Sequence, residues 1–274
     1  MSPLYRLNAL QLELREALSL QPADYRLSVT AGEVQANYVG LQLRSAFQSI
    51  VDLRGDILFG YEALLRVTDQ KNNLIEPLAA FRQAELAQSL VKFDRLCRTL
   101  HTLNYLNLAP SESYLFLNVH SDLLVAVNAH GKVFERVLHQ HDVSTNKVVI
   151  EINESSVANV ELLQLAIDNY RQRGYQIAID NFGKNHFNLE RLWQLSPAFV
   201  KLDPRVIQLA ETDERIQSIL PKLVNIITDL GAQVVAVGVE NPSQLSLLQS
   251  AGIYFAQGFL FDHFTNGLHS SSQQ

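Results

Sequence analysis

Short apolar runs alternate with helical stretches along most of this chain, and this alternation constrains the fold more than any other feature. Most of the gaps from the second run on hold helical stretches such as VELLQLAIDNYRQRG. Such alternation predicts an α/β protein with a parallel sheet. Eight strands within about 220 residues favour a closed (β/α)8 barrel of the TIM type over an open sheet. The runs that suit strands are residues 46–53, 59–67, 114–120, 147–153, 176–182, 198–203, 233–239 and 254–261.

The start of the series departs from a regular barrel. Only LRGDI separates the first two runs, which is hairpin length, so one strand near the start is expected to run antiparallel. The prediction is therefore a variant (β/α)8 barrel. An open doubly wound sheet is the alternative, and the lack of a glycine-rich phosphate loop after any strand argues against it.

The ends of the chain are expected to stand apart from the barrel. Leucines at positions 7, 10, 14 and 18 predict an amphipathic helix over residues 4–20. We expect this helix to cap the domain's own core, with a dimerisation helix, and hence a homodimer, as the alternative. The predicted organisation is a helical extension over 1–40, packed on or next to the barrel, a barrel domain over 41–266 and a flexible tail over 267–274.

Composition narrows the class of partner and the compartment. The formal net charge is −6 and no long basic run exists, which disfavours DNA and anionic membranes as partners. Cys97 is the only cysteine, so we expect a buried thiol in a reducing compartment. No apolar stretch is long enough to span a membrane, and the protein is expected to be cytoplasmic. Trp193, the single tryptophan, is expected in the core.

Polar residues recur where the predicted strands end. In a parallel barrel these ends face one common mouth, where converging carboxylates repel each other unless a cation lies among them. Oxygen donors without clustered His or Cys suit Mg²⁺, Mn²⁺ or Ca²⁺ and not zinc. The residues in these places are Glu62, Asn118, Glu151, Glu154, Asp180, Asn181, Lys201, Asp203, Glu240 and Gln257.

Lys201 would point an ammonium into the same mouth. There it could hold a phosphate or orient a water molecule beside a metal. A structural salt bridge to Asp180 or Asp203 is the alternative. A carboxylate-lined mouth with one lysine fits metal-assisted cleavage of a phosphodiester.

The motifs, taken in order, resemble those of EAL domains, the phosphodiesterases of cyclic di-GMP. Residues 61–66 read YEALLR, which is similar to the signature of that family. AFQSIVDL, FLNVH, EINES, IDNFG, FVKLD, VGVEN and QGFLF follow the family order between about Leu43 and His263. The resemblance implies a variant (β/α)8 barrel and a dinucleotide with two phosphates and two guanines, which water opens to the linear product.

The resemblance also implies roles for individual residues. Lys201 matches the lysine that helps to activate the attacking water, and Glu154 matches the glutamate that holds the loop after the fifth predicted strand. The implied cofactor is Mg²⁺ or Mn²⁺, if any is bound to the altered ligand set. The positions of the implied metal ligands are Glu62, Asn118, Glu151, Asp180, Asn181 and Gln257. The positions of the implied nucleotide contacts are Gln48, Leu65, Arg66 and Glu240.

Three departures from the family pattern weaken the implied metal site. Two adjacent aspartates are replaced by Asp180-Asn181, and an Asn oxygen is a weaker ligand than a carboxylate. The first glutamate of Glu-Gly-Val-Glu is Val237, which can neither coordinate a metal nor accept a proton. The loop that usually reads Asp-Phe-Gly-Thr-Gly-Tyr-Ser-Ser is NFGKNHFN here, over 181–188.

These departures predict that hydrolysis is absent or very slow, and three functions stay open. The first is a cyclic di-GMP receptor that signals through the N-terminal helix or a protein partner. The second is a residual phosphodiesterase in which Asn181 still donates an oxygen. The third is a protein-interaction module that binds neither nucleotide nor metal.

Overall fold

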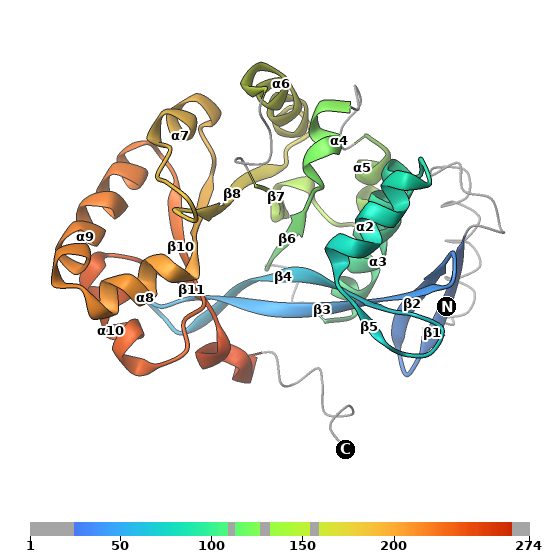
Figure 1. Ribbon diagram of the computed structural model, residues 1–274, viewed down its shortest axis with the longest axis horizontal. Helices are drawn as coiled ribbons and strands as arrows, with labels where there is room; N and C mark the ends of the chain where they lie inside the picture. The colour runs from blue at the N-terminus through green and yellow to red at the C-terminus, as the bar shows by residue number, and fades with distance from the viewer. Residues whose placement is uncertain (1–24, 109–112, 127–131, 154–158, 265–274) are drawn as a thin grey trace. The chain divides into compact units, whose positions relative to one another are not determined.

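The computed structural model describes residues 25–108, 113–126, 132–153 and 159–264 (Figure 1). The predicted helix over 4–20, the tail over 267–274 and Glu154 lie outside these residues. Among the helices that the model describes, none is both long enough and apolar enough to cross a membrane.

The described residues fall into two compact units. The first contains residues 25–46, 63–108 and 132–144, and the second contains 47–62, 113–126, 145–153 and 159–264. The long strands β3 (Leu41–Asp52) and β4 (Ile57–Thr68) each contribute residues to both units.

The second unit contains a closed barrel of eight strands. Its other six strands are β6 (Tyr114–Asn118), β7 (Val148–Ile152), β8 (Gln176–Phe182), β9 (Phe199–Leu202), β10 (Gln233–Val237) and β11 (Phe255–Gln257). They pair in the order β3-β11-β10-β9-β8-β7-β6-β4, and the pairing of β3 with β4 closes the ring. The strands from β6 to β11 are parallel, whereas β3 is antiparallel to β11. The predicted barrel with an antiparallel strand is therefore confirmed.

Helices follow the barrel strands in the alternation that the sequence predicts. They are α4 (Ser121–Ala126), α6 (Val160–Arg171), α7 (Leu189–Leu195), α8 (Pro204–Thr212), α9 (Glu214–Asp229) and α10 (Pro242–Ala251). Side chains cap most of their N-termini: Asn159, Asn188, Asp203, Asp213 and Asn241 each accept a bond from the first turn. Short 3-10 segments occur at Thr145–Lys147 and Phe259–Phe264.

One layer of buried side chains fills the barrel, two residues before the polar positions on β6, β7, β8, β9 and β11 and two residues after Gln48 on the antiparallel strand β3. Its members are Ile50, Phe116, Val149, Ala178, Phe199, Val235 and Phe255. Because strand side chains alternate in direction, the residues two positions later point inward as well. Packing of this layer thus sets the place of the next layer, which is polar.

The exposure of Trp193 contradicts the sequence prediction. This side chain lies on α7 and is 60% exposed, while Leu192 and Leu195 of the same helix are buried. The apolar spacing of α7 already has its buried positions filled by the two leucines, so the tryptophan is left on the outer face.

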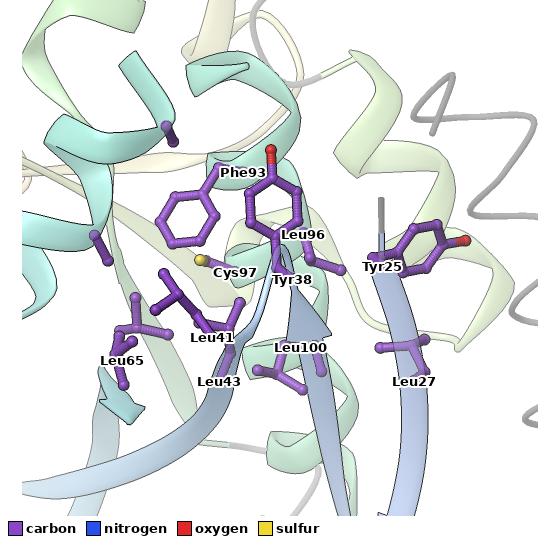
Figure 2. Close-up of a cluster of buried hydrophobic side chains, with 14 of the residues drawn as sticks. Tyr25, Leu27, Tyr38, Leu41, Leu43, Leu65, Phe93, Leu96, Cys97 and Leu100 are labelled. Carbon is purple, nitrogen blue, oxygen red and sulfur yellow. The ribbon is translucent and has the colours of Figure 1, made fainter. Parts of the chain in front are cut away.

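The first unit has a hydrophobic core of its own. It is built from β1 (Tyr25–Thr30), β2 (Glu33–Tyr38), β5 (Leu74–Ile75), α2 (Pro77–Leu86), α3 (Leu90–Leu108), α5 (Lys132–Gln140) and its parts of β3 and β4. Figure 2 shows side chains from β2, β3 and β4 packed against Phe93, Leu96 and Cys97 of α3. Burial raises the pKa of the Cys97 thiol well above its usual value, which agrees with the predicted buried cysteine.

The sequence prediction missed the hairpin formed by β1 and β2. Its strands pair with Thr30 opposite Glu33, and β2 pairs with β3 with Tyr38 opposite Leu41, so each connection is two residues long. Ala31-Gly32 and Val39-Gly40 form these turns, and all four residues have positive φ. Two-residue turns of this kind match the twist of paired strands.

Candidate functional site

Six polar side chains form the inward-facing layer at the C-terminal end of the barrel strands. They are Glu62 on β4, Asn118 on β6, Glu151 on β7, Asp180 on β8, Lys201 on β9 and Gln257 on β11. All six belong to the second unit. The structure thus brings six of the ten predicted strand-end residues into one layer.

Lys201 lies at the centre of this layer. Its Nζ donates to Glu62 Oε2 at 2.6 Å and to Glu151 Oε1 at 2.5 Å. The Lys201 and Glu151 side chains are almost wholly buried, and Glu62 is nearly so. The proximity of the carboxylates raises the pKa of Lys201 despite its burial, so the lysine is charged. Lys201 thus forms salt bridges, as the alternative interpretation expected, but with Glu62 and Glu151 and not with Asp180 or Asp203.

Glu62 accepts hydrogen bonds from three strands. Gln257 Nε2 donates to Glu62 Oε2 at 2.6 Å, and Asn118 Nδ2 donates to Glu62 Oε1 at 3.0 Å. The same Gln257 nitrogen also donates to Gln48 Oε1 on β3 at 2.7 Å. Burial alone would raise the pKa of Glu62, but Lys201 and these amide donors lower it to about 2. Glu62 is therefore the carboxylate that stays charged.

Glu151 and Asp180 behave in the opposite way. Burial raises the pKa of Glu151 well above its usual value, and the charge of Glu62 adds to the increase while Lys201 opposes it. Burial likewise raises the pKa of Asp180, again against the attraction of Lys201. The layer therefore holds one ammonium among three acids, and burial disfavours the charged forms of Glu151 and Asp180.

The Asn181 side chain forms a hydrogen bond with the side chain of the preceding residue, Asp180. The backbone φ of Asn181 is +57°, in the left-handed region that asparagine tolerates better than most residues. Its Nδ2 donates to Asp180 Oδ2 at 2.5 Å. The amide hydrogen thus holds a carboxylate oxygen that would otherwise be open to a cation.

A protein-family model for the EAL domain matches residues 33–263 of this sequence. The chain belongs to the EAL family. The match covers the barrel strands and the whole polar layer, so the family resemblance seen in the motifs is confirmed.

Several bacterial relatives are similar to this EAL protein. The probable cyclic di-GMP phosphodiesterase PdeI of Escherichia coli is 27% identical over 232 residues, covering 80% of this chain and 28% of PdeI. The cyclic di-GMP phosphodiesterase PdeL of the same organism is 24% identical over 241 residues, covering 86% of this chain and 66% of PdeL. The Bacillus subtilis EAL protein YkuI is 25% identical over 218 residues, and this chain spans 53% of it. The chain thus spans about a quarter to a half of several relatives, such as PdeI and YkuI.

Solved structures give the same fold. A standalone EAL protein of Vibrio cholerae O395 in its c-di-GMP-bound form has a TM-score of 0.67 at 26% identity, covering 79% of this chain and 90% of that one. The YkuI structure with c-di-GMP and calcium has a TM-score of 0.64 at 23% identity, covering 80% and 54% of the two chains.

The other predicted site residues of the EAL domain are placed less centrally. Glu240 is exposed, and it is the backbone N–H of Glu240 that donates, to Gln244 Oε1 at 2.8 Å. Asp203 caps α8 and pairs with Arg205. Arg66 is exposed and Leu65 is buried in the core of the first unit, so their nucleotide contacts stay predictions.

The residues present do not fit the two-metal site that the family resemblance implies. Within the ranges that the structure describes, no group of three or more acidic, histidine or cysteine side chains is arranged to hold a metal ion. Lys201 and the Asn181 amide already engage oxygens of all three carboxylates. Val237, two residues after Val235 of the buried layer, adds no ligand.

Sequence reasoning found the polar layer but not its internal bonds. The contact of Gln48 with Gln257 joins two strands that are 209 positions apart, and only the closure of the barrel brings them together. The link between Arg205 and the Lys184 backbone was also missed. The sequence gives one indication of this link: Asp203-Pro204-Arg205 is typical of a capped helix start, which places Arg205 in the first turn of a helix.

Proposed function

We propose that this EAL protein is a cyclic di-GMP receptor that hydrolyses the nucleotide very slowly or not at all. The observation that carries the proposal is that donors of the mouth itself engage each of its three acids: Lys201 binds Glu62 and Glu151, and Asn181 binds Asp180. These internal donors hold the three acids together without a metal.

Hydrolysis should suffer from the loss of two acids at once. Two-metal phosphodiesterases stabilise the attacking and the leaving oxygen with separate ions. Removing one electrostatic contact of this kind costs about 3 kcal/mol of transition-state stabilisation, and each 1.4 kcal/mol is about tenfold in rate. With Asn181 and Val237 in the two positions, catalysis should fall by several powers of ten.

Binding of cyclic di-GMP should survive the loss of the two acids. The nucleotide contacts implied for Gln48 and Arg66 do not depend on a metal, and the Gln48 side chain already accepts a hydrogen bond from Gln257 of the polar layer. The Vibrio cholerae relative that shares 26% of its residues holds c-di-GMP, which supports the choice of ligand. The output would pass to a protein partner, and a homodimer stays a prediction.

Titration calorimetry with cyclic di-GMP, once in Mg²⁺ and once in EDTA, tests the proposal. We expect similar dissociation constants in the two buffers, with intact nucleotide recovered by chromatography afterwards. Binding that needs Mg²⁺, with linear product formed, would overturn the receptor in favour of the enzyme. No heat in either buffer would leave only a protein-interaction module.

A residual phosphodiesterase is the second candidate, and one observation favours it. Among the residues that the structure describes, Glu151 Oε2 and Gln257 Oε1 are buried oxygens without a hydrogen-bond partner. Buried acceptors of this kind are usually satisfied by water or a ligand. A cation that used these two oxygens would leave the bonds of Lys201 in place, and the EDTA arm of the titration detects it.

A further inference from the structure

Helix α8 contacts two loops that follow different barrel strands. The first, the β8–α7 loop, is defined here as residues 183–188 and follows Asn181. The second, called the β10–α10 loop, is defined as residues 238–244, which include the first three residues of α10, and follows Val237. Both loops therefore leave the barrel beside a position where the family's acid is missing.

Arg205, in the first turn of α8, holds the β8–α7 loop. Its Nη2 donates to the Lys184 carbonyl, while its Nε donates to Asp203 Oδ1 at 2.8 Å. The Asp203 N–H in turn donates to the Phe182 carbonyl at 2.9 Å, and the Lys184 N–H donates to the Asn181 carbonyl at 3.1 Å. Backbone and side-chain bonds thus join the start of α8 to the loop base.

Two glycines bring both loops against the same turn of α8. A Cβ on Gly183 would lie 2.8 Å from the Val206 side chain, and a Cβ on Gly238 would lie 2.8 Å from the Pro204 side chain. Such separations are shorter than side chains normally adopt, so these contacts require glycine. The first turn of α8 is packed between the two loops.

Glu211, near the C-terminal end of α8, makes a second contact with the β10–α10 loop, in addition to that of Pro204 with Gly238. It accepts hydrogen bonds from the Ser243 hydroxyl and, at 2.9 Å, from Gln244 Nε2. The buried Gln244 side chain also accepts the Glu240 N–H at 2.8 Å. Through Gln244, the loop backbone at Glu240 is tied to α8.

We propose that α8 is a rigid connection between these two loops, with Arg205 and Glu211 as positioning residues for nucleotide binding at the barrel mouth. A helix held at both ends moves as one body, so the order of one loop depends on the contacts of the other. The nucleotide part of this inference rests on the proposed function, whereas the coupling of the loops does not.

Hydrogen exchange of the free, full-length protein tests the coupling without any nucleotide. Glu211→Ala removes contacts that lie only in the β10–α10 loop, yet we expect amide exchange in the β8–α7 loop to become about tenfold faster. Glu214→Ala, which removes an exposed acid of α9 outside both loops, is the matched control and should leave that exchange unchanged. Faster exchange of the β10–α10 loop alone would overturn the proposal.

The same variants test the link to nucleotide binding. Each of Arg205→Ala and Glu211→Ala should weaken cyclic di-GMP binding by about fivefold to tenfold. The double variant should lose about the same factor as either single one, because releasing one end of α8 already separates the loops, whereas independent effects would multiply. A multiplied loss would overturn the coupled role.

Trp193 supplies a spectroscopic measure of the same coupling. It is the single tryptophan, and its helix α7 begins directly after the β8–α7 loop. Nucleotide should change Trp193 fluorescence in the parent protein, and Glu211→Ala should reduce the amplitude at saturation. An unchanged amplitude would overturn the coupling. If the parent binds no nucleotide, the proposed function fails, and hydrogen exchange alone decides on α8.

Discussion

Asn181 stands at the position of an aspartate in the family pattern, and its amide forms a hydrogen bond with the neighbouring carboxylate. The residue has a left-handed backbone and donates its amide to Asp180, so both its conformation and its hydrogen bond suit asparagine. Aspartate tolerates the same backbone region but would bring a second charge against Asp180. Without a cation, that pair of acids would repel. The asparagine amide therefore stabilises the Asp180 carboxylate without a cation.

Restoring both missing acids should restore hydrolysis. We predict that Asn181→Asp combined with Val237→Glu raises the rate of linear product formation in Mg²⁺ by at least about tenfold, because two ligand carboxylates return to the mouth. The rate is measured by chromatography of cyclic di-GMP and its product. Each single change, which leaves one acid missing, is the control and should raise the rate less. A parent protein that already matches the double variant would refute the degenerate site.

The strand-end residues illustrate how far sequence reasoning reaches at this scale. Parallel topology was enough to predict that Glu62, Glu151 and Lys201 would meet. The partners of Lys201 were not predictable, because Asp203 leaves the strand to cap α8 and Asp180 is occupied by Asn181. Which acid pairs with Lys201 depends on the exact residue at which each strand ends. Apolar patterning does not resolve strand ends to a single residue.

At the scale of elements, the eight barrel strands were predictable because each contains a short apolar run and most of these runs are separated by helices. The hairpin of β1 and β2 was missed although its residues alternate between apolar and polar. Its turns are Ala31-Gly32 and Val39-Gly40, which lack the asparagine or aspartate that usually marks a two-residue turn. Valine with a positive φ is rare, so only the paired structure reveals this connection.

Helix α3 fastens this hairpin through one buried side chain. Asn104 Oδ1 accepts the Val34 N–H, and Asn104 Nδ2 donates to the Val34 carbonyl, both at 2.8 Å. We predict that Asn104→Ala lowers the free energy of unfolding by about 2–4 kcal/mol, because it leaves buried backbone groups of β2 unpaired. Urea unfolding followed by circular dichroism measures the change.

Asn107 on the same helix is the matched control. It is exposed and donates only a 3.3 Å bond to the Gly32 carbonyl, so Asn107→Ala should cost less than about 0.5 kcal/mol. Equal losses in the two variants would mean that α3 loses helix stability in general and that the bonds to β2 contribute little.

At the scale of the whole molecule, stability should depend on pH through one buried histidine. His101 on α3 is 6% exposed, and its Nδ1 lies 2.8 Å from the Ser45 hydroxyl oxygen. Burial lowers the pKa of His101 to about 3, and the charge of Arg66 contributes to the decrease. In the folded chain this imidazole is therefore neutral at any pH well above 3.

Mild acid should therefore destabilise the chain through this histidine. In the unfolded chain the histidine pKa is about 6.5, so below that pH the unfolded state binds a proton that the folded state refuses. The free energy of unfolding should fall by up to about 1.4 kcal/mol per pH unit as the pH drops from 6.5 toward 5. His101→Asn should flatten this slope in urea titrations at several pH values, whereas His139→Asn, at an exposed position of α5, should keep it. A slope that survives in the His101 variant would assign the acid sensitivity to other groups.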